Sequence, residues 1–159
     1  MVDSQNKHID TKSYISDEMQ VGKAGEYLVC CDLICQGKVA FLSEQGLHYD
    51  VIIDIDGKLK TMQVKTSQSL FIDSTKIPKV RFGLRRCKSN KHPYGYNNSG
   101  DVDYFAFVFL PERKIAYFKR EDVLSKNGFY KQCIEFKLET FKYKTKNGRY
   151  IEQYAKFTE

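Results

Sequence analysis

Residues 104–110 are apolar at every position, and this run limits the folds open to the chain more than any other feature. A strand with one exposed face alternates apolar and polar residues, whereas an unbroken apolar run is typical of a strand covered on both faces. Pro111 follows, and residues 114–118 are predicted to form the next strand beyond that turn. Together with the elements that precede it, this run predicts an α/β fold, a mixed sheet flanked by helices.

The remaining elements are predicted from capping residues, alternation and turn residues. A helix is predicted from Ser16, which precedes acidic residues as a capping residue would, to about Gln36. Asp54 is assigned to the Asp56-Gly57 turn, which joins two strands in a hairpin. Strands are predicted at residues 39–43, 49–56, 59–66 and 79–84, a short helix at 120–126, and a final hairpin from 139–144 and 150–157. The rest of residues 67–100 is predicted to be a long polar loop.

The length of the chain predicts one domain. Its 159 residues, 42% of them hydrophobic and 29% charged, are enough to bury a core. Residues 1–16 lack periodicity and are predicted to form a flexible arm, with a single domain over 17–159. We expect its core over about residues 17–126 and a C-terminal hairpin extension over 127–159.

The charge of the chain favours a polyanionic partner. The sequence has 26 Lys and Arg against 20 Asp and Glu, which gives a net charge of +6 and a pI near 9.0. Nucleic acid is the first candidate, ahead of an anionic membrane surface. A membrane span is not expected, because no stretch approaches the ~20 apolar residues that it needs.

The cysteines predict a reducing, cytoplasm-like compartment. They are odd in number, and three of the five fall within residues 30–35, on the predicted helix. That spacing does not suit a disulfide framework, and buried free cysteines behave as small hydrophobic residues.

The residues that carry chemistry lie in the predicted hairpin. Side chains alternate along a strand, so Gln63 and Lys65 point to one face while Met62 and Val64 point to the other. If the neighbouring strand sets Asp50 beside them, the oxygens of Asp50 and Gln63 can bind a hard cation near the ammonium of Lys65. Such a cation and ammonium are the groups that phosphodiester cleavage requires.

This pattern resembles the PD-(D/E)XK endonuclease superfamily over roughly residues 20–120. Asp50 matches the first acid, Gln63-Val64-Lys65 matches the (D/E)XK triplet, and Glu26 matches the acid on the helix. The spacing of thirteen positions between Asp50 and Gln63, with Gln as the second ligand, is most similar to the group I intron homing endonucleases of cyanobacterial type. The sequence departs from the superfamily pattern at Tyr49, in place of Pro, and at the neutral Gln63.

The resemblance implies a restriction-endonuclease-like core and a Mg²⁺-dependent endonuclease that hydrolyses double-stranded DNA, with Mn²⁺ as a possible substitute. Asp50, Gln63, Glu26 and the backbone carbonyl of Val64 are then the expected metal ligands, and Lys65 completes the catalytic set. A homodimer or homotetramer is expected, because two cuts across a duplex require two sites.

A basic stretch after the hairpin is the predicted DNA-binding surface. Residues 76–91 contain seven Lys or Arg and no Asp or Glu: Lys76, Lys79, Arg81, Arg85, Arg86, Lys88 and Lys91. Cations of this density suit phosphate contacts, although a solvated loop can have the same composition. The last predicted hairpin adds Lys142, Lys144, Lys146 and Arg149, for which both interpretations are equal.

Three other functions stay open from the sequence. A restriction enzyme or a Holliday-junction-resolving nuclease on the same core differs only in the DNA that it prefers. A catalytically decayed DNA-binding module is the second class, since Gln63 removes a negative charge from the site. A structural or protein-interaction domain is the third, and it would lack salt-dependent affinity for DNA.

Overall fold

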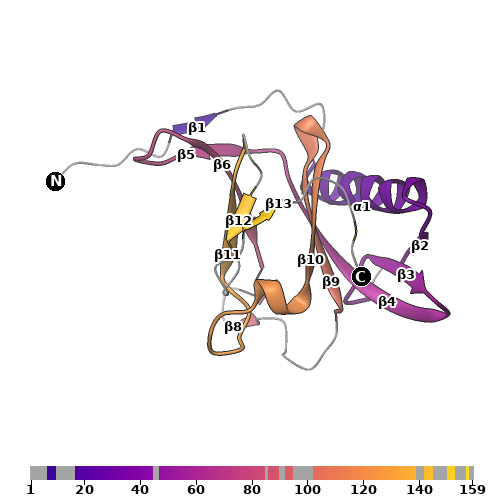
Figure 1. Cartoon of the computed structure of the whole chain (residues 1–159). Helices are drawn as coiled ribbons and strands as arrows, with labels where there is room; N and C mark the ends of the chain where they lie inside the picture. The colour runs from indigo at the N-terminus through magenta and orange to yellow at the C-terminus, as the bar shows by residue number, and fades with distance from the viewer. Residues whose placement is uncertain are drawn as a thin grey trace.

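The structure of the protein is a computed structural model that describes residues 7–9, 17–44, 47–84, 86–89, 92–94, 102–138, 142–144, 150–152 and 157. Side chains are described for residues 17–44, 47–84, 102–138 and 157. In this part of the chain, one long helix, a five-stranded sheet and a four-stranded sheet lie side by side (Figure 1). The five-stranded sheet is the middle layer, so the predicted α/β architecture is confirmed.

The middle sheet is mixed. Its strand order is β10-β9-β4-β3-β2, with β2 at Val39–Leu42, β3 at Val51–Ile55, β4 at Lys58–Ser67, β9 at Tyr104–Phe109 and β10 at Lys114–Lys119. The pair β4 and β9 is parallel, and every other neighbouring pair is antiparallel. The strands agree with the predicted ones to within two residues at each end.

Strand β9 is buried on both faces, as its composition predicts. Phe105, Phe107 and Phe109 belong to one core cluster, which also takes in the second sheet. Ala106 and Val108 belong to the other cluster, together with residues of the helix. Alternate side chains of this apolar run therefore pack into two different cores.

Helix α1 (Glu18–Cys35) covers one face of the middle sheet. Asp17 is its N-cap, one residue beyond the predicted Ser16, and the Asp17 side chain accepts a hydrogen bond of 2.8 Å from the Met19 backbone N–H. The buried residues recur every four positions, at Val21, Gly25, Val29 and Leu33. This spacing directs one stripe of the helix at the sheet.

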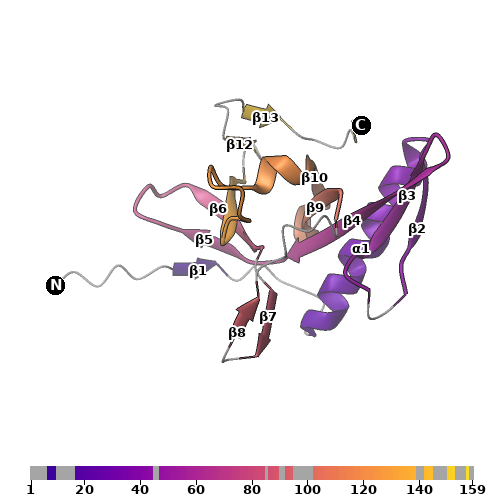
Figure 2. The same ribbon diagram turned by 90° about the horizontal axis from the view of Figure 1, so that it is seen from below.

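The other face of the middle sheet packs against a second sheet of order β1-β5-β6-β11 (Figure 2). Its strands are β1 at Lys7–Ile9, β5 at Leu70–Ile72, β6 at Pro78–Gly83 and β11 at Cys133–Lys137. Strand β6 confirms the strand predicted at residues 79–84, whereas β5 occupies part of the predicted loop of residues 67–100, which is wrong there. Strand β1 lies within residues 1–16, where no strand was predicted. Strand β11 has no counterpart in the prediction. These short strands gain stability by pairing with distant segments, which local patterns do not reveal.

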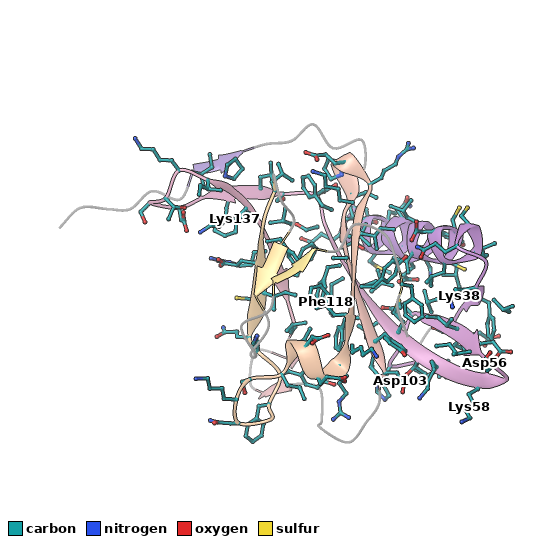
Figure 3. The ribbon with its side chains drawn as sticks, viewed as in Figure 1. Lys38, Asp56, Lys58, Asp103, Phe118 and Lys137 are labelled. Carbon is teal, nitrogen blue, oxygen red and sulfur yellow. The ribbon has the colours of Figure 1, made fainter. Side chains whose placement is uncertain are left out.

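The space between the two sheets is filled by aromatic rings. Phe107 lies 5.2 Å from Phe82, 5.3 Å from Phe118 and 5.6 Å from Phe136, measured between ring centroids. Figure 3 shows Phe118 in this space. Tyr130, Ile134 and Phe136 are also buried, so the packed core extends past residue 126, where the sequence predicted its end.

The other elements are short. Strands β7 (Arg86–Ser89) and β8 (His92–Tyr94) pair with each other, as do β12 (Lys142–Lys144) and β13 (Tyr150–Glu152). The latter pair confirms the predicted C-terminal hairpin, with shorter strands. Two 3-10 helices, η1 at Leu110–Glu112 and η2 at Arg120–Val123, flank β10, and η2 lies within the short helix predicted at 120–126.

The four cysteines whose side chains are described, Cys30, Cys31, Cys35 and Cys133, are free. Among the described residues, no helix combines the length and the apolar character that crossing a membrane requires.

Candidate active site

A tight hairpin sets Asp50 beside Gln63. Asp56 and Gly57 both have positive φ, 51° and 78°, as a two-residue hairpin turn requires. The Gly57 N–H donates to Asp54 Oδ1 at 2.8 Å, which confirms that Asp54 belongs to the turn. From this turn the register runs to the pair Val51 and Met62, so the next positions along the strands are Asp50 and Gln63.

The carboxylate of Asp50 lies against the edge of β4, just before the partner strand β3 begins. The backbone N–H of Val64 donates to Asp50 Oδ2 at 2.7 Å, and Gln63 Nε2 donates to the same oxygen. Gln63 Nε2 also lies 3.5 Å from the Val64 carbonyl oxygen. One carboxylate, one side-chain amide and one backbone carbonyl therefore meet in a single space.

Glu26 lies on helix α1, and its negative charge acts on Asp50. Its side chain is 19% exposed, and Glu26 Oε2 accepts a hydrogen bond of 2.6 Å from Lys23 Nζ, one helical turn earlier. The same turn contains Gly25, which packs on Thr66 of β4: a Cβ atom at position 25 would lie 1.9 Å from Thr66 Oγ1. Only glycine allows helix and strand to approach this closely, and the approach fixes where Glu26 lies.

The Thr66 hydroxyl under Gly25 is a buried polar group. Among the described residues, Thr66 Oγ1 is the one buried side-chain oxygen or nitrogen atom that has no hydrogen-bond partner. Such a group destabilises the folded state. We attribute it to the tight packing of α1 on β4 beside the site.

Lys65 extends from β4 on the face away from α1. Met62 and Val64 are buried in the cluster that contains the helix residues, so the alternation along β4 turns Gln63 and Lys65 to the other face. Lys65 is half-buried. Its positive charge lowers the pKa of Asp50.

The pKa of Asp50 is raised above its ordinary value. Burial is the largest cause, and the negative charge of Glu26 raises the pKa further. The hydrogen bond from Val64 and the charges of Lys65 and Lys23 act in the opposite direction without cancelling the effect. Two acids and two lysines from α1, β4 and the start of β3 therefore share one electrostatic environment.

The donor set fits a hard divalent cation. Asp50 and Glu26 contribute carboxylates, while Gln63 and Val64 contribute neutral oxygens, which are the ligands that Mg²⁺ and Mn²⁺ accept. The crowding of Asp50 and Glu26 also leaves negative charge that a cation would neutralise. No group of three or more His, Cys, Asp or Glu with metal-binding geometry occurs among the described residues, so this site has only two acids. The amide nitrogen of Gln63 faces Asp50. Rotation of this amide by half a turn about the last side-chain torsion, which rotates easily, would place its oxygen there instead.

The predicted DNA-binding stretch is only partly described. Lys79 forms an ion pair with Asp73, and Arg81 Nη2 lies 2.7 Å from Glu135 Oε1 on β11. The sequence window contains no acid, but neighbouring segments supply two, so these cations are partly neutralised. Lys76 is exposed in a turn. The side chains of Arg85, Arg86, Lys88 and Lys91 lie outside the described residues, as do those of the C-terminal hairpin.

Two contributors to the site were not predicted from the sequence. Lys23 pairs with Glu26, and its charge acts on Asp50 as well. The spacing of three residues between Lys23 and Glu26 on a helix was the available signal. The packing of Gly25 on Thr66 depends on the tertiary fold, and the sequence contained no signal for it.

Comparisons with known proteins identify the family of the chain. The family model described as PD-(D/E)XK endonuclease matches residues 16–157. The chain therefore belongs to the PD-(D/E)XK endonuclease family, whose enzymes generally use divalent metal ions.

A solved structure, that of the bacterial homing endonuclease I-Ssp6803I, has a similar fold. The two sequences are 18% identical, the TM-score is 0.57, and the match covers 76% of this chain and 78% of that chain. At this identity the similarity establishes the fold alone. A comparison with curated proteins gives no match.

Proposed function

We propose that the protein is a Mg²⁺-dependent endonuclease that hydrolyses phosphodiester bonds in double-stranded DNA, with Mn²⁺ as a substitute. The observation that carries this proposal is the convergence of Asp50, Gln63 and the Val64 carbonyl at the edge of β4, within the electrostatic range of Glu26 and Lys65. Family membership supports the reaction class.

Each side chain has a defined task in this proposal. The cation would be held by Asp50, Glu26, Gln63 and the Val64 carbonyl. When bound, it would neutralise the charge that develops on the phosphate and lower the pKa of the attacking water. Lys65 holds that water near the phosphate and stabilises negative charge in the transition state. Val64 N–H and Gln63 keep the Asp50 carboxylate oriented before DNA arrives.

We further propose that cleavage is site-specific, as in a homing endonuclease, and that the active form is a homodimer or homotetramer. The support is the likeness of fold to the bacterial homing endonuclease I-Ssp6803I. A single chain offers one candidate site, and a closed symmetric assembly would present two or more to a duplex.

Cleavage of a supercoiled plasmid pool and of phage DNA, with Mg²⁺ or with EDTA, tests the proposal. We expect discrete, Mg²⁺-dependent cuts that disappear in Asp50→Ala and Lys65→Ala. Lys58→Ala is the matched control, because Lys58 is exposed at the far end of the hairpin. Cuts that persist in both site variants, or that need no metal, would contradict the proposed chemistry.

One observation favours a second candidate, a DNA-binding module that has lost cleavage. Gln63 is neutral, and its amide already satisfies Asp50. Such a module would bind DNA equally well with and without chelator and would nick no substrate. A restriction or junction-resolving nuclease, by contrast, would cleave a short palindrome or a four-way junction in preference to a long single site.

A further inference from the structure

Lys23 pairs with Glu26, one of the two acids proposed to hold the cation. Its Nζ donates a 2.6 Å hydrogen bond to Glu26, whose side chain is 19% exposed. The hydrogen bond to Glu26 is the largest cause of the raised pKa of Lys23, and the charges of Glu26 and Asp50 raise it further. Lys23 is thus a positive charge near both acids of the candidate site.

This ion pair differs from an ordinary pair on a helix surface. Exposed pairs at this spacing have little effect, because water screens both partners. Here the acid is mostly buried, and Lys23 also lowers the pKa of Asp50, which lies on another segment. The side chain of Lys23 itself is 39% exposed, so it can leave the acid for solvent or for another anion.

We propose that Lys23 is the counter-ion of the site. While the cation is absent, Lys23 neutralises Glu26 and so competes with the binding of the cation. When the cation binds, Lys23 is released and contacts a DNA phosphate. This inference rests on the proposed metal-dependent function. It follows from charge balance, because two acids and a divalent cation leave no net negative charge for Lys23 to neutralise. A released ammonium beside a phosphate-cleaving site then has the incoming phosphate as its nearest anion.

Metal affinity tests the first half of the inference without any turnover. The binding of Mn²⁺ to the full chain is measured at pH 8 by the decrease of the EPR signal of free Mn²⁺. The Lys23→Met variant should bind Mn²⁺ roughly threefold to tenfold more tightly than the wild type. Lys23→Arg keeps the charge and should bind as the wild type does. Lys58→Met makes the same change of net charge, but about 17 Å from Gln63 along β4, and should also leave the affinity for Mn²⁺ unchanged. Figure 3 shows Lys58 at that distant end.

DNA affinity tests the second half. In a Lys65→Met background, which keeps DNA intact, fluorescence anisotropy of a labelled duplex is measured against salt concentration, with Mn²⁺ and with EDTA. Adding Lys23→Met should reduce the slope of log affinity against log salt by about one with Mn²⁺ present, the signature of one lost phosphate contact. With EDTA the slope should be unchanged, because Lys23 is then held by Glu26.

The outcomes separate this inference from the proposed function. Unchanged or weaker Mn²⁺ binding in Lys23→Met, beside measurable wild-type binding, overturns the counter-ion role and leaves the nuclease proposal standing. Equal salt slopes in Mn²⁺ overturn the release to phosphate. If neither protein binds Mn²⁺ at millimolar concentrations, the metal-dependent function fails, and the inference fails with it.

Discussion

Two regions of the middle sheet, the aromatic layer on one face and the edge of β4, are built from different chemistry. Between the two sheets, aromatic rings such as Phe82, Phe107 and Phe136 pack at centroid distances of 5.2–5.6 Å and are at most 2% exposed. At the edge of β4, two acids, two lysines and an amide share a half-buried space, and the pKa of Asp50 is raised. The first region stabilises the folded state, whereas the second destabilises it by holding like charges together.

This difference predicts that stability and activity can be separated by substitution. Residues of the aromatic layer should affect unfolding far more than cleavage under conditions where the protein stays folded. Residues at the edge of β4 should do the reverse, because their folded arrangement suits a cation and a phosphate better than it suits the chain alone. Substitutions in the two regions, and at the contact between α1 and β4, test this contrast.

Phe107→Ala should lower the free energy of unfolding by about 3–5 kcal/mol, because it leaves a cavity among rings that are fully buried. Urea denaturation followed by far-ultraviolet circular dichroism measures the loss. At temperatures where the variant remains folded, cleavage should stay within a few-fold of wild type. A stability loss under about 1 kcal/mol would contradict the assignment of this layer as the main core.

Asp50→Asn should lower the cleavage rate by at least roughly a hundredfold, because the amide cannot offer a charged ligand. Its stability at pH 7 should equal or exceed that of the wild type, since the folded chain disfavours the charged carboxylate. Single-turnover cleavage and thermal melting are measured on the same preparation. A variant that is both active and destabilised would reverse the proposed contrast.

Gly25→Ala should reduce both stability and cleavage, because the new methyl group would lie 1.9 Å from Thr66 Oγ1 and must push α1 away from β4. We expect a stability loss of about 1–3 kcal/mol, as for other overpacked sites.

Thr66→Ala provides the matched test, because it removes the clashing hydroxyl. Alone it should be neutral or slightly stabilising, since that hydroxyl is buried without a partner among the described residues. Combined with Gly25→Ala it should recover part of the lost cleavage and of the Mn²⁺ affinity. Failure to recover either would remove the role of this contact in positioning Glu26.

The pH dependence of stability should have opposite signs at Asp103 and Asp50. Asp103, which immediately precedes β9, accepts hydrogen bonds of 2.9 Å from Thr61 N–H and 3.0 Å from Lys60 Nζ. Burial raises the pKa of Asp103, but these hydrogen bonds outweigh it and hold the pKa below the ordinary 3.8. Its contribution is therefore present above pH 3.8 and lost as the pH falls through the lowered pKa.

Asp103→Asn should consequently lose about 1 kcal/mol near neutral pH, a modest figure because the side chain is 36% exposed and screened by water. The loss should shrink in acid. The stability that Asp50→Asn gains over the wild type should also shrink in acid. As the pH falls through the raised pKa of Asp50, the wild-type carboxyl becomes neutral and its destabilising charge is lost. Melting temperatures from pH 3 to pH 8 for both variants check the two signs.

The sequence predicted the elements that carry their own local signals. The apolar run at residues 104–110, the Asp56-Gly57 turn and the four-residue spacing along α1 each specify structure without reference to distant segments. The same local signals placed Asp50 opposite Gln63, because the turn fixes the register of the hairpin.

What escaped prediction depends on pairing between distant segments. Strands β5 and β11 are short, and their partners, β1 and β6, are separated from them in sequence. The acids that pair with Lys79 and Arg81 lie outside the basic window that predicted DNA contacts. The ion pair of Lys23 was visible as a spacing, but its effect on Asp50 requires the position of α1 on β4.

We propose that Asp50, Gln63, Glu26 and the Val64 carbonyl hold a divalent cation. Anomalous diffraction from crystals soaked in Mn²⁺ tests it most directly. We predict one strong anomalous peak bounded by these four groups, with the Gln63 amide oxygen turned toward it, and no such peak in Asp50→Asn crystals. Crystals that cleave soaked DNA in Mn²⁺ yet show no peak at this place, or show it elsewhere, would contradict the account.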